Sequence, residues 1–199
     1  NEIIQSKLKI YAKININVSN DQPKSIAKSI SIGMIKFTNL LEKLKPELIV
    51  VLGDRFELIP ICYSSTLLNI PIVHFNGGES SEGSIDEATR HCISKLSHIH
   101  FATTTLYRQK LINMGENPKK VFNVGSLSVE NVKTSCSLSR EKISKILKIK
   151  NKNNFFLITY HPSTLEIKKS INEIKNLIKA ITKFKNFNYI FTGTNNDPR

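Results

Sequence analysis

The sequence predicts an α/β fold built around a parallel β-sheet. Short apolar runs of strand length recur along the chain, and segments with apolar residues at helical spacing separate them. Several of these runs are followed by turn residues. For example, the run that ends at Leu52 is followed by Gly53 and Asp54. Buried runs that alternate with helices are typical of parallel sheets. We therefore expect strands at 8–18, 48–52, 70–75, 98–102, 121–124, 155–160 and 188–192.

The first of these strands differs from the others, because residues 8–18 alternate only loosely and fit an edge strand. A helix over 24–44 follows and ends before Pro46. The helix that begins near Ile85 is predicted to bury one face, which would carry Ile85, Ala88, Cys92 and Leu96. Other helices are expected at 56–68, 104–114, 138–149 and 165–184.

Acidic side chains follow two of the strands at their carboxyl ends. Asp54 ends the first long apolar run, and Glu79 follows the turn formed by Asn76, Gly77 and Gly78. Ligands of open α/β sheets bind at these strand ends. The two glycines allow the backbone to approach a ligand closely or to adopt positive φ. A second reading of Asp54 stays open, in which it only caps the next helix.

A further carboxylate pair stands at the start of the helix near Ile85. Ser84 and Glu87 match a capping box, in which Glu87 would reach back to the Ser84 amide. Asp86 and Arg90 are four residues apart and share a helix face, so they can form an ion pair. Two readings of Asp86 stay open, a functional carboxylate and a partner in a surface pair.

The charge of the chain raises the question of a nucleic-acid partner. The formal net charge is +13, from 29 Lys plus Arg against 16 Asp plus Glu. The lysines are scattered through helices rich in Asn and Ile, and no aromatic–basic recognition motif occurs. We therefore expect no nucleic-acid partner.

Cysteine usage and hydropathy restrict the class further. Cys62, Cys92 and Cys136 are widely spaced and form no CxxC pair, so neither disulfides nor a zinc site are expected. Cys62 and Cys92 are predicted to be buried free thiols. The sequence shows no metal-ligand cluster, no apolar stretch of membrane-spanning length and no signal peptide at its start. These features fit a cytoplasmic protein without a metal or membrane partner.

Six short fragments follow one another in a specific order along most of the chain. They are GDRFE (53–57), HFNGGE (74–79), EGSIDEATRH (82–91), KLSHIHFATT (95–104), FNVGS (122–126) and ITYHPSTLE (158–166). Each fragment alone is a weak signal, but the ordered set resembles one enzyme family, the hydrolysing UDP-N-acetylglucosamine 2-epimerases. These are the NeuC-type enzymes of sialic-acid and related nonulosonic-acid biosynthesis.

The resemblance implies two Rossmann-like domains in the GT-B arrangement, here truncated at both ends. The first domain would cover 1–132 and lack its first strand, a linker would cover 133–139, and 140–199 would start the second domain. The family's Ser- and Gly-rich nucleotide-binding segment is expected to be missing, so the 199-residue chain alone is expected to be inactive. The implied partner is a UDP-sugar substrate, with no cofactor and a possible homo-oligomer.

The resembling enzymes remove the C2 proton of a UDP-sugar and expel UDP, giving a glycal to which water then adds. This chemistry needs a positioned base and a second group that assists the departing atoms. The resemblance assigns catalytic roles to Asp54, Glu79, Asp86 and His161. It assigns substrate binding to Asn76, Gly77, Gly78, Glu82, Arg90 and Ser126.

One position departs from the family's pattern. Asn76 stands where some members carry an acid, and an amide cannot act as a base. Glu79 or Glu82 would then supply the missing carboxylate, so the identity of the C2 base stays open. His74, inside an apolar strand, is predicted to be a packed and hydrogen-bonded histidine.

The substrate and the reaction class also leave alternatives. The sugar is either N-acetylglucosamine or the 2,4-diacetamido-2,4,6-trideoxy analogue. The rivals to a hydrolysing enzyme are a non-hydrolysing 2-epimerase and a nucleotide-sugar-binding module without turnover. A nucleic-acid binder, suggested by charge alone, is the weakest of them.

Overall fold

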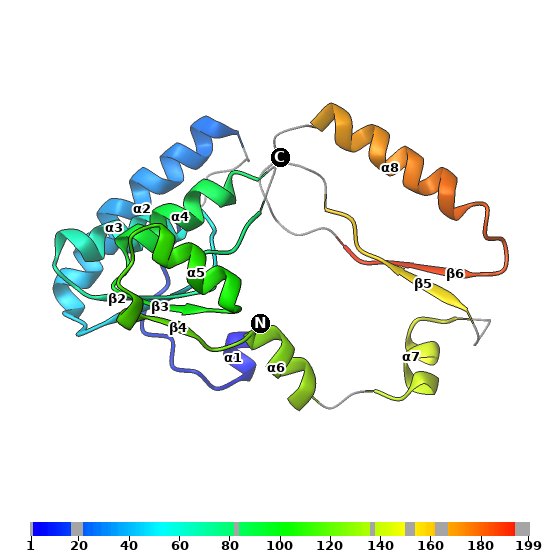
Figure 1. Cartoon of the computed structure of the whole chain (residues 1–199), viewed down its shortest axis with the longest axis horizontal. Coiled ribbons are helices and arrows are strands. Elements are labelled where there is room, and N and C mark those ends of the chain that lie inside the picture. Colours follow the sequence, from blue (N-terminus) through cyan, green and yellow to red (C-terminus); the bar gives the residue numbers. More distant parts are fainter. Residues whose placement is uncertain are drawn as a thin grey trace. The chain divides into compact units, whose positions relative to one another are not determined.

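The computed structural model describes residues 2–16, 22–81, 84–135, 138–149, 154–161 and 167–193. The chain divides into two compact units. The first comprises residues 1–79 and 88–124, and the second comprises 80–87 and 125–199. The first unit contains a four-stranded sheet and the second a two-stranded sheet (Figure 1). The domain limits expected from the sequence stay a prediction.

The sheet of the first unit is parallel throughout. Its strands are β1 (Ile49–Leu52), β2 (Ile72–Phe75), β3 (Ile99–Ala102) and β4 (Val121–Asn123), and they lie in the order β1-β2-β3-β4. The connecting helices are α3 (Leu58–Leu67), α4 (Asp86–Leu96) and α5 (Thr105–Asn113), with a short 3₁₀ turn η1 (Pro118–Lys120) before β4. The strands lie side by side in the order of the sequence, and parallel strands are joined by crossovers of the same hand. The connecting helices therefore lie on one face of the sheet (Figure 1). The predicted α/β fold with a parallel sheet is confirmed.

The two faces of this sheet are covered differently. On the helical face, Val51 and Ile72 pack against Cys62 of α3 and Ile93 of α4. A second cluster joins the ends of β3 and β4 to Leu111 of α5. On the other face, a row of apolar side chains in register crosses all four strands. The two residues at the ends of this row, Leu52 and Phe122, are 56% and 46% exposed. The row consists of Leu52, Phe75, Phe101 and Phe122.

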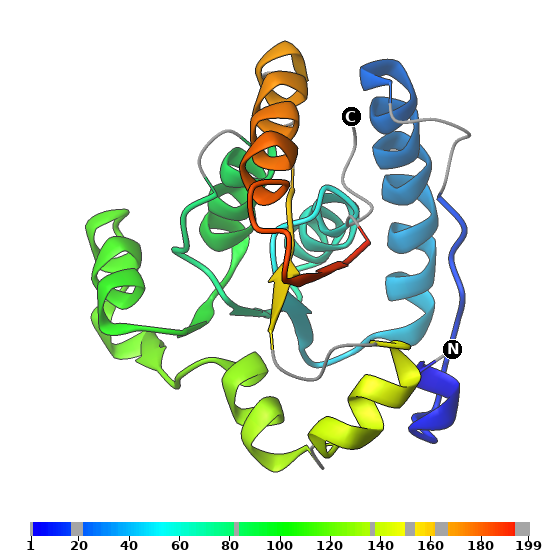
Figure 2. The same cartoon turned by 90° about the vertical axis from the view of Figure 1, so that its right-hand side faces the viewer.

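The segment before the sheet corrects one prediction. Residues 8–16 form no strand, and 17–18 lie outside the described residues. The Asn15 carbonyl instead accepts a hydrogen bond from Lys36 Nζ at 2.7 Å, and Ile16 is buried near Gly33. Both partners belong to α2 (Pro23–Leu44), so the segment runs along a helix and not along a sheet edge. Figure 2 shows α2 lengthwise, in blue, together with the short α1 (Glu2–Gln5).

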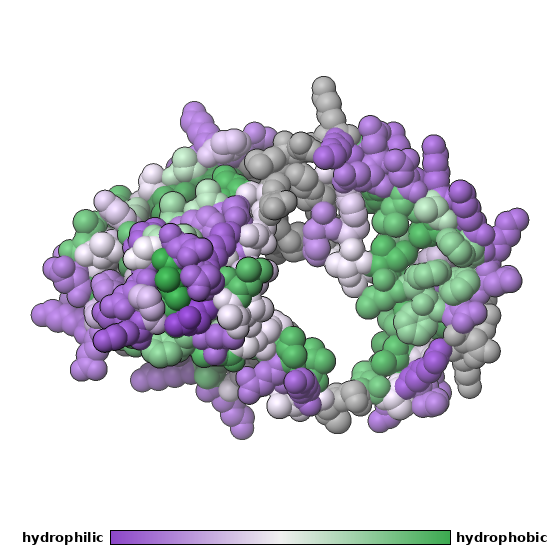
Figure 3. All heavy atoms as spheres, in the orientation of Figure 1, coloured by the Kyte–Doolittle hydropathy of each residue, from purple (hydrophilic) through white to green (hydrophobic). Residues whose placement is uncertain are grey.

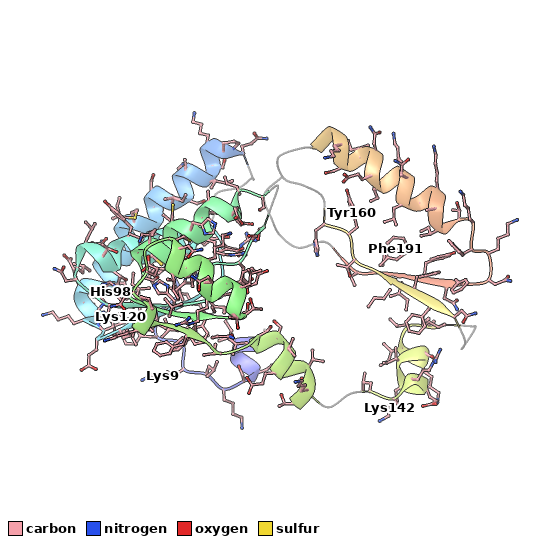
Figure 4. The ribbon with its side chains drawn as sticks, viewed as in Figure 1. Lys9, His98, Lys120, Lys142, Tyr160 and Phe191 are labelled. Carbon is pink, nitrogen blue, oxygen red and sulfur yellow. The ribbon has the colours of Figure 1, made fainter. Side chains whose placement is uncertain are left out.

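The second unit has its own strand–helix–strand order. Helices α6 (Leu127–Thr134) and α7 (Arg140–Ile146) precede β5 (Phe155–Ile158), α8 (Ile167–Ile181) and β6 (Asn188–Phe191), and the two strands pair in parallel. Tyr160, labelled in Figure 4, donates from its hydroxyl to the Ser170 carbonyl of α8 at 3.1 Å. The sequence of α8 is rich in lysine, and Figure 3 shows hydrophilic atoms over one side of this helix and hydrophobic atoms around β5 and β6. Helix α8 is therefore amphipathic, but its apolar residues Ile171, Ile174 and Ile178 remain 49%, 38% and 47% exposed, so the small sheet does not bury its apolar face.

Candidate active site

Three charged side chains converge at the carboxyl ends of β1 and β2. Arg90 Nη2 forms an ion pair with Asp54 Oδ2, and Arg90 Nη1 lies 3.9 Å from Glu79 Oε2. The other oxygen of Glu79 accepts a hydrogen bond from Thr103 Oγ1 at 2.7 Å. We call Asp54, Glu79, Arg90 and Thr103 the Arg90 cluster. It joins the ends of three neighbouring strands to helix α4.

Burial makes this cluster unusual. The Arg90 side chain is only 7% exposed, while those of Asp54 and Glu79 are 22% and 26% exposed. Arg90 Nε and Nη1 donate no hydrogen bond to any described residue. Buried donors without an acceptor carry a free-energy cost, so each one needs a physical explanation such as a ligand, a water molecule or an ion. Two carboxylates against one guanidinium also leave a net negative charge, which suits proton abstraction better than diphosphate binding.

Two backbone turns present the carboxylates. Gly53 has φ +91° and donates its N–H to Phe75 O, so β1 stays paired up to the residue before Asp54. Asn76 also has positive φ, and its N–H donates to Phe101 O. Asp54 is not a helix cap, because α3 begins at Leu58 with Glu57 before it. The reading of Asp54 as only a capping residue is therefore wrong.

Gly78 is required at the second turn for a steric reason. Its φ is +77°, and a Cβ there would lie 2.6 Å from the Tyr107 carbonyl oxygen and 2.9 Å from Leu111 Cγ. Both neighbours belong to α5. The close approach that this glycine allows is therefore to the chain's own helix, and it fixes where Glu79 emerges.

The segment before α4, which belongs to the second unit, differs in detail from the expected capping box. Glu87 accepts a hydrogen bond from the Ser81 amide, and the Ser84 amide donates to Ser81 O. Ser84 Oγ accepts from the Asp86 amide at 3.1 Å and donates to Asp86 Oδ2 at 3.0 Å. Ser84 therefore caps the helix through the Asp86 amide, while Ser81 donates its amide to the Glu87 carboxylate and accepts from the Ser84 amide. Asp86 itself is buried, at 8% exposure.

Helix α4 buries a different face from the one expected. Ile85 is 46% exposed and Cys92 is exposed, so the prediction that these residues face the core is wrong. The helix and the residue after it bury mostly polar side chains: Asp86, Thr89, Arg90, Ile93, Ser94 and Ser97. Burial of Arg90 and Ser94 is possible because strand ends supply partners for their polar groups, which a hydrophobicity pattern does not reveal.

His74 lies beneath the Arg90 cluster as the packed histidine that was expected. It is fully buried, its Nε2 lies 2.8 Å from Gly53 O and its Nδ1 lies 3.2 Å from Ser94 Oγ. Burial lowers the pKa of the His74 imidazole to about 4. His74 and Thr103 fall inside the fragments HFNGGE and KLSHIHFATT, and Ser94 falls in no fragment, but nothing in the sequence indicated that these three side chains contact the cluster.

The remaining expected site residues lie outside this cluster. His161 follows β5 and is exposed, and Ser126 precedes α6 as its N-cap without a side-chain capping bond. Both belong to the second unit. Glu82 lies outside the described residues. Their roles stay predictions.

A second ionic cluster lies toward the opposite, amino end of the sheet. Glu116 accepts from Lys95 Nζ at 2.6 Å through one oxygen and lies 3.1 Å from His100 Nε2 through the other. Burial lowers the pKa of His100. Lys95 also donates to Met114 O at 3.3 Å, so the cluster ties α4 to the end of α5. We call Lys95, His100 and Glu116 the Glu116 cluster.

One further cavity lies away from both clusters. A cavity of about 620 Å³ lies at the amino ends of β1 and β2 and is lined in part by Pro46, Glu47, Ile70 and Pro71. It contains none of the expected site residues. Within the described ranges, no group of three His, Cys, Asp or Glu side chains could hold a metal ion, and no helix is long and apolar enough to cross a membrane.

Comparison with known proteins gives consistent matches. The family described as UDP-N-acetylglucosamine 2-epimerase matches residues 1–199. The chain is 41% identical over 98% of its length to the GDP/UDP-N,N'-diacetylbacillosamine 2-epimerase (hydrolyzing) of Campylobacter jejuni. It is 34% identical over 90% of its length to the UDP-N,N'-diacetylbacillosamine 2-epimerase (hydrolyzing) of Legionella pneumophila. The chain spans about half the length of these relatives (50% and 48%).

Solved structures agree in fold. The UDP-GlcNAc 2-epimerase of Neisseria meningitidis bound to UDP-GlcNAc matches with a TM-score of 0.80 at 21% identity, over 98% of this chain and 54% of that one. The UDP-GlcNAc 2-epimerase of Methanocaldococcus jannaschii in complex with UDP-GlcNAc and UDP matches with a TM-score of 0.73 at 21% identity, over 98% and 53%. These likenesses establish the GT-B type of fold that was expected.

Proposed function

The chain belongs to the UDP-N-acetylglucosamine 2-epimerase family, and from this membership we propose that the intact protein is a hydrolysing 2-epimerase of a UDP-linked N-acetylated hexosamine. The enzyme removes the proton at C2 while the bond from C1 to UDP breaks, which leaves a glycal. Water then adds across the double bond: its hydroxyl bonds to C1, and a proton returns to C2 on the opposite face. The products are UDP and the free 2-epimeric sugar.

The observation that carries the proposal is the Arg90 cluster. A C2 proton is weakly acidic, so its removal needs a carboxylate held in place within reach of the sugar. Asp54 and Glu79 share one buried guanidinium at the strand ends, where ligands of such sheets bind. A shared Arg fixes the geometry of both carboxylates before the substrate arrives.

Within this cluster we assign the C2 base to Glu79. Thr103 binds its Oε1, whereas Oε2 lies 3.9 Å from Arg90, which is beyond hydrogen-bond distance. Asp54 pairs directly with Arg90 and is the better candidate for orienting the guanidinium. Asp86 and His161 are assigned to the proton transfers that accompany departure of the UDP oxygen and entry of the water molecule. Asn76, Gly77, Gly78, Glu82 and Ser126 are assigned to substrate binding.

The proposed sugar is the 2,4-diacetamido-2,4,6-trideoxy hexose. Two relatives at 41% and 34% identity carry N,N'-diacetylbacillosamine in their names, which supports this choice over N-acetylglucosamine. The free 2-epimer would then enter nonulosonic-acid synthesis in the cytoplasm. The described cysteines, Cys62 and Cys92, are both free thiols, as a reducing compartment allows. A homo-oligomer stays a prediction.

Proton NMR of the intact protein in heavy water tests the reaction. Incubation with the UDP-diacetamido sugar and, separately, with UDP-N-acetylglucosamine should give UDP and a free sugar that carries deuterium at C2. We expect faster turnover of the diacetamido substrate. Release of a UDP-linked epimer without free sugar would show the non-hydrolysing reaction instead, and UDP binding without turnover would indicate a binding module.

A further inference from the structure

We infer that His74 is a positioning residue, which fixes the three segments that carry Asp54, Glu79 and Arg90 relative to one another. The expected effect on kcat rests on the proposed function, whereas the contacts of the His74 ring do not depend on it. The side chain touches neither carboxylate through a hydrogen bond, so it would act through the backbone and through helix α4. The inference depends on three contacts of one imidazole ring.

The first contact is with the turn after β1. His74 Nε2 lies 2.8 Å from the carbonyl oxygen of Gly53, the residue immediately before Asp54. Gly53 has φ +91°, a conformation that most residues avoid, so this turn gains from an added restraint. The hydrogen bond sets the plane of the peptide that leads into Asp54.

The second contact is with helix α4. His74 Nδ1 lies 3.2 Å from Ser94 Oγ, and Ser94 is fully buried. Ser94 follows Arg90 by one helical turn and lies on the same face. A restraint on Ser94 therefore also restrains the position from which Arg90 extends to the carboxylates.

The third contact is with the loop that carries Glu79. A Cβ at Gly77 would lie 2.9 Å from His74 Nδ1 and 3.3 Å from its Cε1. The Gly77 backbone therefore packs directly against the ring, and no larger residue fits there without displacement. One imidazole thus contacts both loops and the helix of the Arg90 cluster.

The hydrogen-bonding partners determine the tautomer. Gly53 O can only accept, so Nε2 must carry the proton. Nδ1 is then the acceptor, and Ser94 Oγ must donate to it. Burial, Arg90 and His100 all disfavour the cation, whereas the Gly53 carbonyl and Asp54 favour it, and the pKa falls to about 4. A neutral ring at working pH can hold these positions but cannot exchange protons with substrate.

Two isosteric substitutions separate the contacts. The amide nitrogen of His74→Gln can occupy the place of Nε2 and donate to Gly53 O, whereas His74→Asn reaches only the place of Nδ1. In the intact protein we expect His74→Asn to lower kcat about 10- to 100-fold with little change in KM, because a small misplacement of reacting groups has effects of this size. His74→Gln should retain kcat within about fivefold. His98 is exposed and lies before β3, and its Nδ1 accepts from the Ile72 amide at 3.3 Å. His98→Asn is the matched control, because the Asn oxygen can take the place of Nδ1, and this variant should keep the wild-type kcat.

The kinetic outcomes are decisive in either direction. If His74→Asn and His74→Gln keep the same kcat or lose it equally, the bond to Gly53 does not position the site and the inference is wrong. A loss in His74→Asn that appears in KM and not in kcat would also overturn it. The thermal midpoint of each variant should be measured alongside, so that the kinetics refer to folded protein.

A second measurement keeps the inference testable if the proposed function fails. Long-range ¹H–¹⁵N NMR spectra report which imidazole nitrogen carries the proton, and the His74 signal is assigned by its absence in His74→Gln. The Nε2–H tautomer should persist across neutral pH whatever the substrate proves to be. An Nδ1–H tautomer or a cation at pH 7 would overturn the inference, while a wild-type protein that turns over neither UDP-sugar would contradict only the proposed function.

Discussion

The Arg90 cluster and the Glu116 cluster lie in the same unit and use similar groups, yet they differ in how completely those groups are paired. In the Glu116 cluster a single carboxylate serves two donors, Lys95 and His100, with one oxygen for each. Among the described residues, Nδ1 of His100 is the one buried polar atom of this cluster that has no hydrogen-bond partner. In the Arg90 cluster two carboxylates share one guanidinium, two of whose nitrogens donate no hydrogen bond within the described residues. Incomplete pairing at the carboxyl ends of strands, rather than burial of charge alone, distinguishes the candidate active site.

The two clusters should differ most in activity and stability when the positively charged side chain of each is replaced. Arg90→Met leaves Asp54 and Glu79 without a counter-charge, so turnover should be lost and the free energy of unfolding should fall by about 3 kcal/mol. Lys95→Met is the matched control, because Lys95 is 53% exposed and such pairs contribute about 0–1 kcal/mol. Urea unfolding and the NMR assay measure both effects. Equal losses of activity in the two variants would remove the distinction.

Neutralising one carboxylate in each cluster should separate activity from stability. Asp54→Asn should lower kcat by about 10²- to 10⁴-fold, the range for loss of a catalytic or orienting acid group, and should cost about 1–2 kcal/mol of stability, because the Asn oxygen still accepts a hydrogen bond from buried Arg90 but no longer balances its charge. Glu116→Gln should cost about 1–2 kcal/mol of stability through its two donors but leave kcat within about threefold. Steady-state kinetics and thermal midpoints of the intact protein compare them. A Glu116→Gln enzyme that folds normally but turns over slowly would refute a purely structural role for that cluster.

The two buried histidines should make the folded state sensitive to acid. The pKa of His74 is lowered from 6.5 to about 4, and that of His100 is lowered as well. Because the unfolded chain binds these protons more readily, stability is full above pH 6.5 and falls as the pH drops toward 4. His74 alone should account for about 1 kcal/mol by pH 5.5. Urea unfolding between pH 7.5 and 5 should show a weaker pH dependence for His74→Gln than for wild type, and an unchanged slope would contradict the lowered pKa.

The smallest effect is expected at Cys92, which lies on α4 between Arg90 and Lys95 but on its exposed face. Iodoacetamide should modify Cys92 in the native protein and spare Cys62, whose thiol pKa is raised to about 12 by burial. The modified enzyme should keep its activity, because neither cluster is touched. Peptide mass spectrometry locates the modification. Loss of activity that depends on Cys92 would mean that this face of the helix also serves the site.

The sequence predicted the parallel sheet and the positions of its strands better than it predicted which side chains are buried. Strand runs such as Ile49–Leu52 are apolar throughout and carry their own signal. Residues 8–16 alternate only loosely between polar and apolar residues, and Asn15 and Ile16 contact α2, because such an alternation does not reveal which neighbour is present. On α4 the apolar face was expected inside, yet Arg90 and Ser94 are buried, since distant strand ends supply their partners. Pairings that join residues far apart in the sequence are the information that a local pattern lacks.

The inward face of α4 also bears on how this sequence can drift over evolutionary time. Each residue inserted into a helix rotates everything after it by about 100° and advances it by about 1.5 Å. One insertion between Arg90 and Ser94 would turn Ser94 away from His74, whereas substitutions at the exposed Ala88 and Cys92 disturb neither contact. Homologous genes should therefore vary freely at those two positions but show no insertions or deletions from Thr89 to Ser97.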